Sequence, residues 1–97
     1  MTTPKVPREA LSLEVRPGMT PKKIGDFLKG ARQTAGKTQV EVGKKMGVVA
    51  NHIARFESGK VEPMLSTIAK FVKALGGTLV IRVEWGRGER SGDGGEK

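Results

Sequence analysis

The stretch that decides the fold is residues 37–60, KTQVEVGKKMGVVANHIARFESGK. The stretch contains four valines, which are β-branched and favour strands, and TQVEV alternates apolar and polar side chains as a strand does. The same stretch holds a Thr-x-x-Glu box that begins at Thr38, a central glycine at position 47 and a terminal Glu-Ser-Gly-Lys. It therefore fits either a β-hairpin or two short helices joined by a turn.

The cap and spacing signals favour the two helices. The box at Thr38 matches a helix capping box, and Gly47 permits a left-handed turn. Ile53 and Phe56 lie three residues apart, as on one face of a helix. A hairpin would need its turn within GKKMG, and ANHIARFE does not alternate. The stretch is thus predicted to be helix, glycine turn, helix.

Helical spacing continues on either side of this stretch. Thr20 is a candidate N-cap, Pro21 suits the first helical position, and Gly36 fits the position after a helix. Residues 61–77 are predicted to form a further helix. Its expected apolar stripe consists of Leu65, Ile68, Ala69, Val72 and Leu75. Residues 20–77 thus form one predicted helical domain.

The two ends of the chain have other patterns. TLVIRVEW (78–85) alternates strictly, which predicts a strand, and LSLEV (11–15) indicates a second, short strand in the N-terminal arm, residues 1–19. The Gly-rich residues 86–97 are predicted to be a disordered tail. Because an unpaired apolar strand invites association, we expect residues 78–85 to pair with a second copy in a dimer. The face expected to make this contact carries Leu79, Ile81, Val83 and Trp85.

The charge lies on the predicted helical domain and its strand. The chain of 97 residues has a net charge of +8, and residues 20–84 hold 12 Lys and Arg against 5 Asp and Glu. Nucleic acid is the leading polyanionic partner for such a surface. The alternative is a well-solvated basic face without a partner.

The composition of the chain argues against several other classes of protein. There is no cysteine, so disulfides and thiolate metal sites are excluded, and a reducing cytoplasm suits the chain. His52 is the lone histidine, which argues against a metal site. There is no apolar run of about 18 residues and no signal-peptide core, so we expect a cytoplasmic protein without a membrane span. With no plausible nucleophile–base pair and 4% aromatic residues, we expect neither an enzyme nor a cofactor.

These elements together resemble a known family. LKGARQTAGKTQVEVGKKMG, HIARFESGKVEP and LSTIAKFVKALGG, in this order and spacing, make residues 24–77 similar to the Cro/Xre-type, lambda-repressor-like helix-turn-helix family. The resemblance implies a mostly α fold of four to five helices, here with a C-terminal strand and a short N-terminal strand paired in a dimer. It also implies that helix 49–57 enters the major groove of double-stranded DNA.

The resemblance assigns roles residue by residue. The residues implied to read bases are Gln39, Ala50, Asn51, Ala54 and Arg55. Helical spacing independently places 50, 51, 54 and 55 on one face, opposite Ile53 and Phe56. The residues implied to contact phosphate are Thr38, Lys44, Lys45, His52 and Lys60. Arg32 and Glu57 match the structural ion pair between the first and third helices of the family.

The sequence departs from the family at several positions. Val49 and Met64 stand where a Ser or Thr usually caps a helix, so both helices are expected to lack a side-chain cap. Gly43 replaces a common alanine. We expect these changes to reduce stability more than binding.

Two functions remain open at this stage. The first is a sequence-specific transcriptional regulator, most simply a repressor. The second follows from a looser resemblance of the helix-turn-helix plus ALGGTLVIRVE to antitoxins of the HipB/HigA type, which neutralise a toxin and regulate their own operon. No toxin is identified by the sequence.

Overall fold

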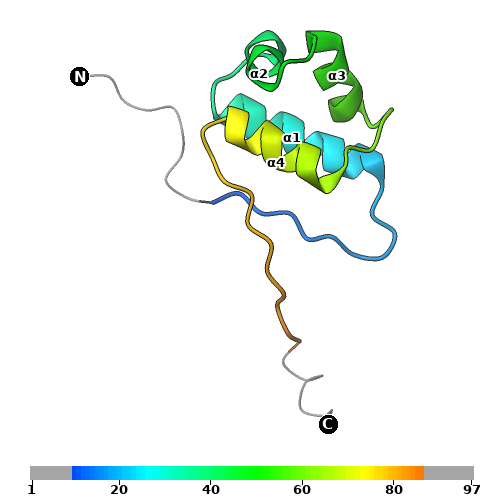
Figure 1. Cartoon of the computed structure of the whole chain (residues 1–97). Coiled ribbons are helices and arrows are strands. Elements are labelled where there is room, and N and C mark those ends of the chain that lie inside the picture. The colour runs from blue at the N-terminus through cyan, green and yellow to red at the C-terminus, as the bar shows by residue number, and fades with distance from the viewer. Residues whose placement is uncertain (1–9, 87–97) are drawn as a thin grey trace, which may run out of the picture.

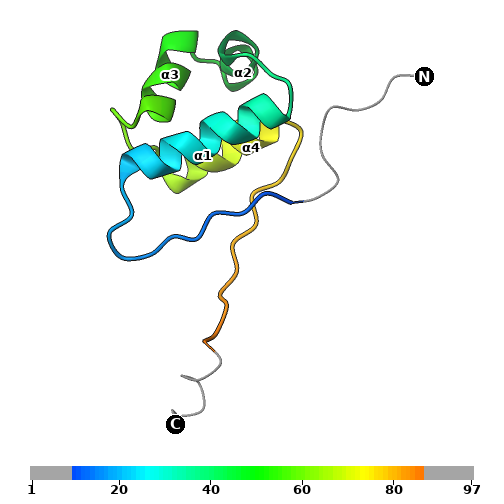
Figure 2. The same ribbon diagram turned by 180° about the vertical axis from the view of Figure 1, so that it is seen from behind.

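The computed structural model describes residues 10–86, in which four helices follow one another (Figure 1). They are α1 (Pro21–Thr34), α2 (Gln39–Met46), α3 (Ala50–Ser58) and α4 (Leu65–Ala74). α2 and α3 lie together on one side of α1 and α4, as both views show (Figures 1 and 2). The described part is all-helical, and the predicted helix, turn and helix in residues 37–60 are confirmed.

Local signals set the helix ends. The Thr20 hydroxyl accepts from the backbone amide of Lys23 at 3.2 Å, and Pro21 occupies the first turn of α1. α2 ends at Gly47 and α3 at Gly59, with φ of 77° and 83°. Both angles lie in the left-handed region that glycine adopts without strain. These glycines therefore stop α2 and α3 where the sequence predicted.

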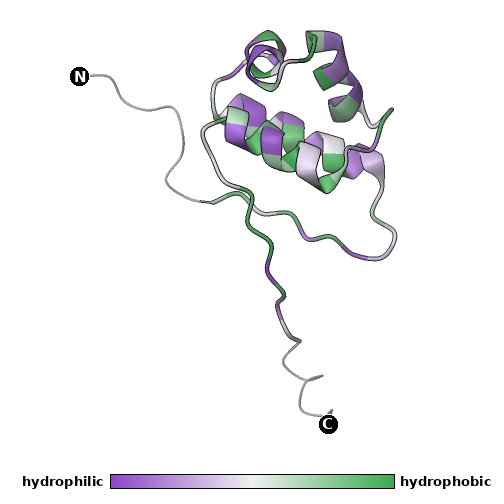
Figure 3. Cartoon of the chain, viewed as in Figure 1, coloured by the Kyte–Doolittle hydropathy of each residue, from purple (hydrophilic) through white to green (hydrophobic). Residues whose placement is uncertain are grey.

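The core joins all four helices. Its largest fully buried side chains are Leu28, Val42, Ile53 and Phe71, one from each helix. Figure 3 shows hydrophobic residues on the faces that the helices turn toward one another. Burial of each such side chain stabilises a fold by about 1.5–3 kcal/mol. This small core fixes the position of α3 against α1 and α2.

For the last helix the predicted bounds were wrong, and the predicted apolar stripe was confirmed only in part. The helix was expected over 61–77, but α4 spans Leu65–Ala74. Of the predicted apolar stripe, Ile68 packs against the core and Leu75 is 6% exposed, whereas Leu65 is 58% exposed. The buried side chains within α4 are those of Phe71 and Ala74. Because α4 is apolar on more than one side, its spacing alone did not determine which side faces the core.

The two predicted strands are not formed within residues 10–86. Residues 11–15 and 78–85 run without strand pairing, because a strand needs a neighbouring strand to accept and donate its backbone hydrogen bonds. Val80, Ile81, Val83 and Trp85 are 67–75% exposed, and hydrophobic residues colour this segment in Figure 3. Pairing between two copies stays a prediction, and the predicted tail lies outside the described residues except for Gly86.

None of the helices in residues 10–86 is long and apolar enough to cross a membrane.

Candidate nucleic-acid interface

The turn between α2 and α3 is held by a close backbone contact. A side chain at Gly43 would place its Cβ 2.6 Å from the carbonyl oxygen of Val48, which is too near for any real Cβ. The Val48 amide in turn donates to the Gly43 carbonyl at 2.9 Å. The expectation that Gly43 reduces stability is therefore wrong for this arrangement, since glycine is what lets the turn fold back onto α2.

A second close contact fixes α3 on α1. A Cβ at Gly25 would lie 2.5 Å from the carbonyl oxygen of Glu57, near the end of α3. Gly59, which follows α3, would place a Cβ 2.7 Å from the Cα of Lys22. These glycines allow the backbones of the two helices to approach closely. The C-terminal half of α3 is therefore held against α1.

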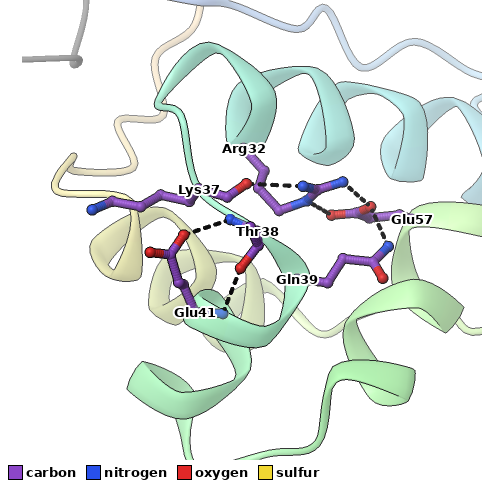
Figure 4. Close-up of polar contacts among 6 residues, drawn as sticks. All are labelled: Arg32, Lys37, Thr38, Gln39, Glu41 and Glu57. Atoms are coloured by element: carbon purple, nitrogen blue, oxygen red, sulfur yellow. Dashed lines mark hydrogen bonds and ion pairs between the residues drawn. The ribbon is translucent and has the colours of Figure 1, made fainter.

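A buried ion pair joins the same helices (Figure 4). Arg32 Nε and Nη2 donate to the two carboxylate oxygens of Glu57 at 2.6 and 3.0 Å. The guanidinium also donates to the Lys37 carbonyl at 2.9 Å. Arg32 and Glu57 are 9% and 4% exposed. The structure thus has the ion pair that the sequence led us to expect between α1 and α3.

Gln39 belongs to this network. Its Nε2 donates to Glu57 Oε1 at 3.0 Å, so Glu57 receives hydrogen bonds from α1 and from the first residue of α2 (Figure 4). The side chain is half-buried. Sequence reasoning assigned Gln39 to base reading and missed this contact, for which the sequence carries no local signal. The amide nitrogen still carries a second hydrogen.

The N-terminus of α2 is closed by the predicted capping box. The Thr38 hydroxyl accepts from the Glu41 amide at 3.0 Å, and the Thr38 amide donates to the Glu41 carboxylate at 2.8 Å (Figure 4). That amide donation is the main cause of a lowered pKa of Glu41. The Thr38 hydroxyl is thus already engaged in the cap.

The outer side of α3 carries the residues expected to read bases. Asn51 and Arg55 are exposed, and Ala50 and Ala54 are half-buried. Within residues 10–86, neither the Asn51 amide nor the Arg55 guanidinium forms a side-chain hydrogen bond. Ser58 is exposed beside them, and its hydroxyl donates to the Arg55 carbonyl at 3.2 Å. Ser58 is not among the residues that the sequence predicted for the site.

The other residues expected to contact phosphate come from α2, from α3 and from the residue after Gly59. Lys44 and Lys45 lie in the last turn of α2, Lys60 follows α3, and all three are exposed. His52 is exposed too, and its ring meets Phe56 edge to face with centroids 4.8 Å apart. These side chains are therefore solvent-accessible.

A hollow of about 320 Å³ lies where α1, α2 and α3 meet. The residues that line it are Lys22, Asp26, Lys29, Gln39, Ala54, Glu57 and Ser58. Two α1 lysines, Lys22 and Lys29, thus border the α3 side chains. Their spacing of seven residues on α1 was the signal that they share one side. Within residues 10–86, no cluster of His, Asp and Glu side chains could hold a metal ion.

Comparisons with known proteins agree with this geometry. A family model described as "Helix-turn-helix domain" matches residues 23–85. No curated protein matches the chain. Among solved structures, a complex of a HipB variant with an O2 20mer is similar, with a TM-score of 0.58 and 26% sequence identity. The similarity covers 74% of this chain and 97% of that chain.

Proposed function

Because the chain belongs to the helix-turn-helix domain family, whose model spans residues 23–85, we propose that it is a sequence-specific DNA-binding transcriptional regulator, most simply a repressor. The observation that carries the proposal is the outer side of α3. It presents two exposed hydrogen-bonding side chains on a helix whose position is fixed by close glycine contacts and a buried ion pair. A major groove admits a helix of this kind.

The α3 side chains suit base edges. Asn51 can pair bidentately with adenine and Arg55 with guanine. Ala50 and Ala54 offer small apolar contacts beside them. Gln39 can donate through its second amide hydrogen while it keeps its bond to Glu57. In this proposal α3 reads the sequence and Gln39 contributes from the start of α2.

Phosphate contacts supply most of the affinity in such complexes. We assign them to Lys44, Lys45, His52 and Lys60, which are exposed, and to Thr38, whose hydroxyl accepts in the α2 cap and keeps its own hydrogen for a phosphate oxygen. The net charge of +8 favours approach to DNA. Affinity should therefore fall steeply as the salt concentration rises.

The active form in this proposal is a homodimer. Residues 78–85 would pair with the same residues of a second copy. This pairing would bury the face of Leu79, Ile81, Val83 and Trp85, most of which is exposed in a single chain. Two α3 helices would then address half-sites about one helical turn apart. Sedimentation showing only monomer at tens of micromolar would contradict this part of the proposal.

A second candidate is an antitoxin that neutralises a toxin and also regulates its own operon. The similarity to a HipB complex favours it, at 26% identity over 74% of this chain. The discriminating experiment is co-purification of the full chain with the product of a neighbouring small reading frame. Recovery of a stable complex would support the antitoxin function. If no complex is recovered, the regulator without a toxin partner is the function that stands.

Selection of bound duplexes from a random DNA pool tests the main proposal. We expect a recurring sequence with two half-sites. Asn51→Ala and Arg55→Ala should each lose about 1–3 kcal/mol on that sequence and relax its specificity. Lys60→Ala should weaken all duplexes alike and make the salt dependence shallower. If the three variants behave alike on selected and random DNA, the base-reading assignment is wrong.

A further inference from the structure

Val49, the residue before α3, is an uncapped apolar residue with an exposed side chain. It is the N-cap residue, with extended backbone (φ −79°, ψ 156°), and makes no side-chain cap hydrogen bond. Its carbonyl accepts from the His52 amide at 3.0 Å, so the backbone turn is normal. The isopropyl group is 70% exposed. The N-cap of α3 thus lacks the hydroxyl that usually stabilises this position, and an apolar group is exposed to water instead.

The chemistry of this group limits what it can recognise. We propose that Val49 is a specificity-determining residue that contacts the 5-methyl group of a pyrimidine in the major groove, which rests on the proposed function. The N-terminal residues of a recognition helix lie nearest the base edges. A side chain with two methyl groups can neither donate nor accept a hydrogen bond. The one apolar group on the major-groove edge of a natural base pair is the thymine methyl, and 5-methylcytosine presents the same group.

A comparison within the chain separates this role from simple tolerance of an uncapped helix. Met64, the N-cap of α4, also makes no side-chain cap hydrogen bond and is also 70% exposed. It precedes a helix that has no part in the proposed reading face. Met64→Ser is therefore the matched control, since it adds a cap hydroxyl and removes an exposed apolar group without touching α3.

The experiment uses the full chain and the duplex selected from a random pool, with each thymine replaced in turn by deoxyuridine. This replacement removes the methyl group alone. We expect one position at which it weakens binding by the wild type about fourfold, the effect of one buried methyl. Val49→Ser should weaken binding to the thymine duplex by a similar factor and be insensitive to deoxyuridine at that position. It should also raise the melting temperature by restoring a cap.

A second arm distinguishes the two sources of the methyl group. Each cytosine of the duplex is replaced in turn by 5-methylcytosine. A gain of about fourfold that is absent in Val49→Ser would assign the contact to a methylated cytosine, and a loss confined to deoxyuridine would assign it to thymine.

Three results would contradict a methyl contact by Val49. If no methyl removal or addition changes affinity, or if Val49→Ser keeps the wild-type response, Val49 does not read a methyl group. The same holds if Met64→Ser reproduces the response of Val49→Ser. A chain that binds no duplex at all would overturn the proposed function itself, which is a different result from binding that ignores the methyl groups.

Discussion

Replacement of Arg32 by methionine should destabilise the protein more than any single change on its surface. The guanidinium makes two hydrogen bonds to Glu57 and one to the Lys37 carbonyl. The side chains of Arg32 and Glu57 are only 11% and 3% exposed. Methionine fills similar space but leaves a buried carboxylate with the Gln39 amide as its remaining side-chain donor.

The expected magnitude follows from this geometry. Removal of one partner of a buried ion pair costs about 3–5 kcal/mol, because the other charge stays desolvated. Small domains are stable by about 5–15 kcal/mol in total. The double variant Arg32→Met, Glu57→Leu removes both charges and should recover most of the loss. Lys22→Gln breaks a surface pair with Asp26, 62% and 57% exposed, and should cost less than about 1 kcal/mol.

Urea unfolding followed by far-ultraviolet circular dichroism measures these differences. Trp85 is 75% exposed and lies after α4, so its fluorescence would report on the wrong segment. With a slope of about 1 kcal/mol per molar urea, a loss of about 3–5 kcal/mol in Arg32→Met should lower the midpoint by about 3–5 M. A loss below about 1 kcal/mol, or a double variant no more stable than Arg32→Met, would refute the reasoning.

Three further predictions concern the turn, the cap and the C-terminal segment. Gly43→Ala should destabilise the fold, because its Cβ would clash with the carbonyl oxygen of Val48. The matched variant Gly30→Ala places its Cβ where no atom lies within 4 Å, and thermal melts should show a gain of about 0.5–1 kcal/mol in stability. Because the folded pKa of Glu41 is lowered, its contribution to stability is present above the ordinary value of 4.5 and is lost as pH falls through the lowered value. Glu41→Gln should flatten this acid limb of melting temperature against pH. Truncation after residue 77 should leave the helices folded by circular dichroism but yield a monomer in sedimentation; a truncated dimer would contradict the strand-pairing prediction.

The parts of the fold that the sequence predicted rest on local chemistry. The capping box at Thr38 and the left-handed glycine at 47 each act within a few residues, so the letters alone identify them. They outweighed the β-branched valines because a strand needs a distant partner and a capped helix does not. The ion pair of Arg32 and Glu57 spans 25 residues, and only the family resemblance placed it in advance.

The parts that the sequence did not predict depend on contacts between distant elements. The buried side of α4 was predicted only in part: Ile68 and Leu75 contact the core as expected, but Leu65 and Phe71 are both apolar and only packing selects Phe71. Gly25 and Gly43 gave no periodic signal, yet each lies where another backbone passes too close for a Cβ. In the same way the bond from Gln39 to Glu57 requires α2 and α3 to be placed first.

The structure separates what holds α3 in place from what α3 presents. Ile53 and Glu57 face inward and are almost fully buried, whereas Asn51 and Arg55 face outward. Changes at the two outward positions should therefore alter the sequence that is read with little effect on folding. Gln39 is the exception, because its amide bonds the buried Glu57 and is also proposed to donate its second hydrogen to a base. A Gln39 variant should thus lose stability and binding together, and the two losses must be measured side by side before a base contact is assigned to it.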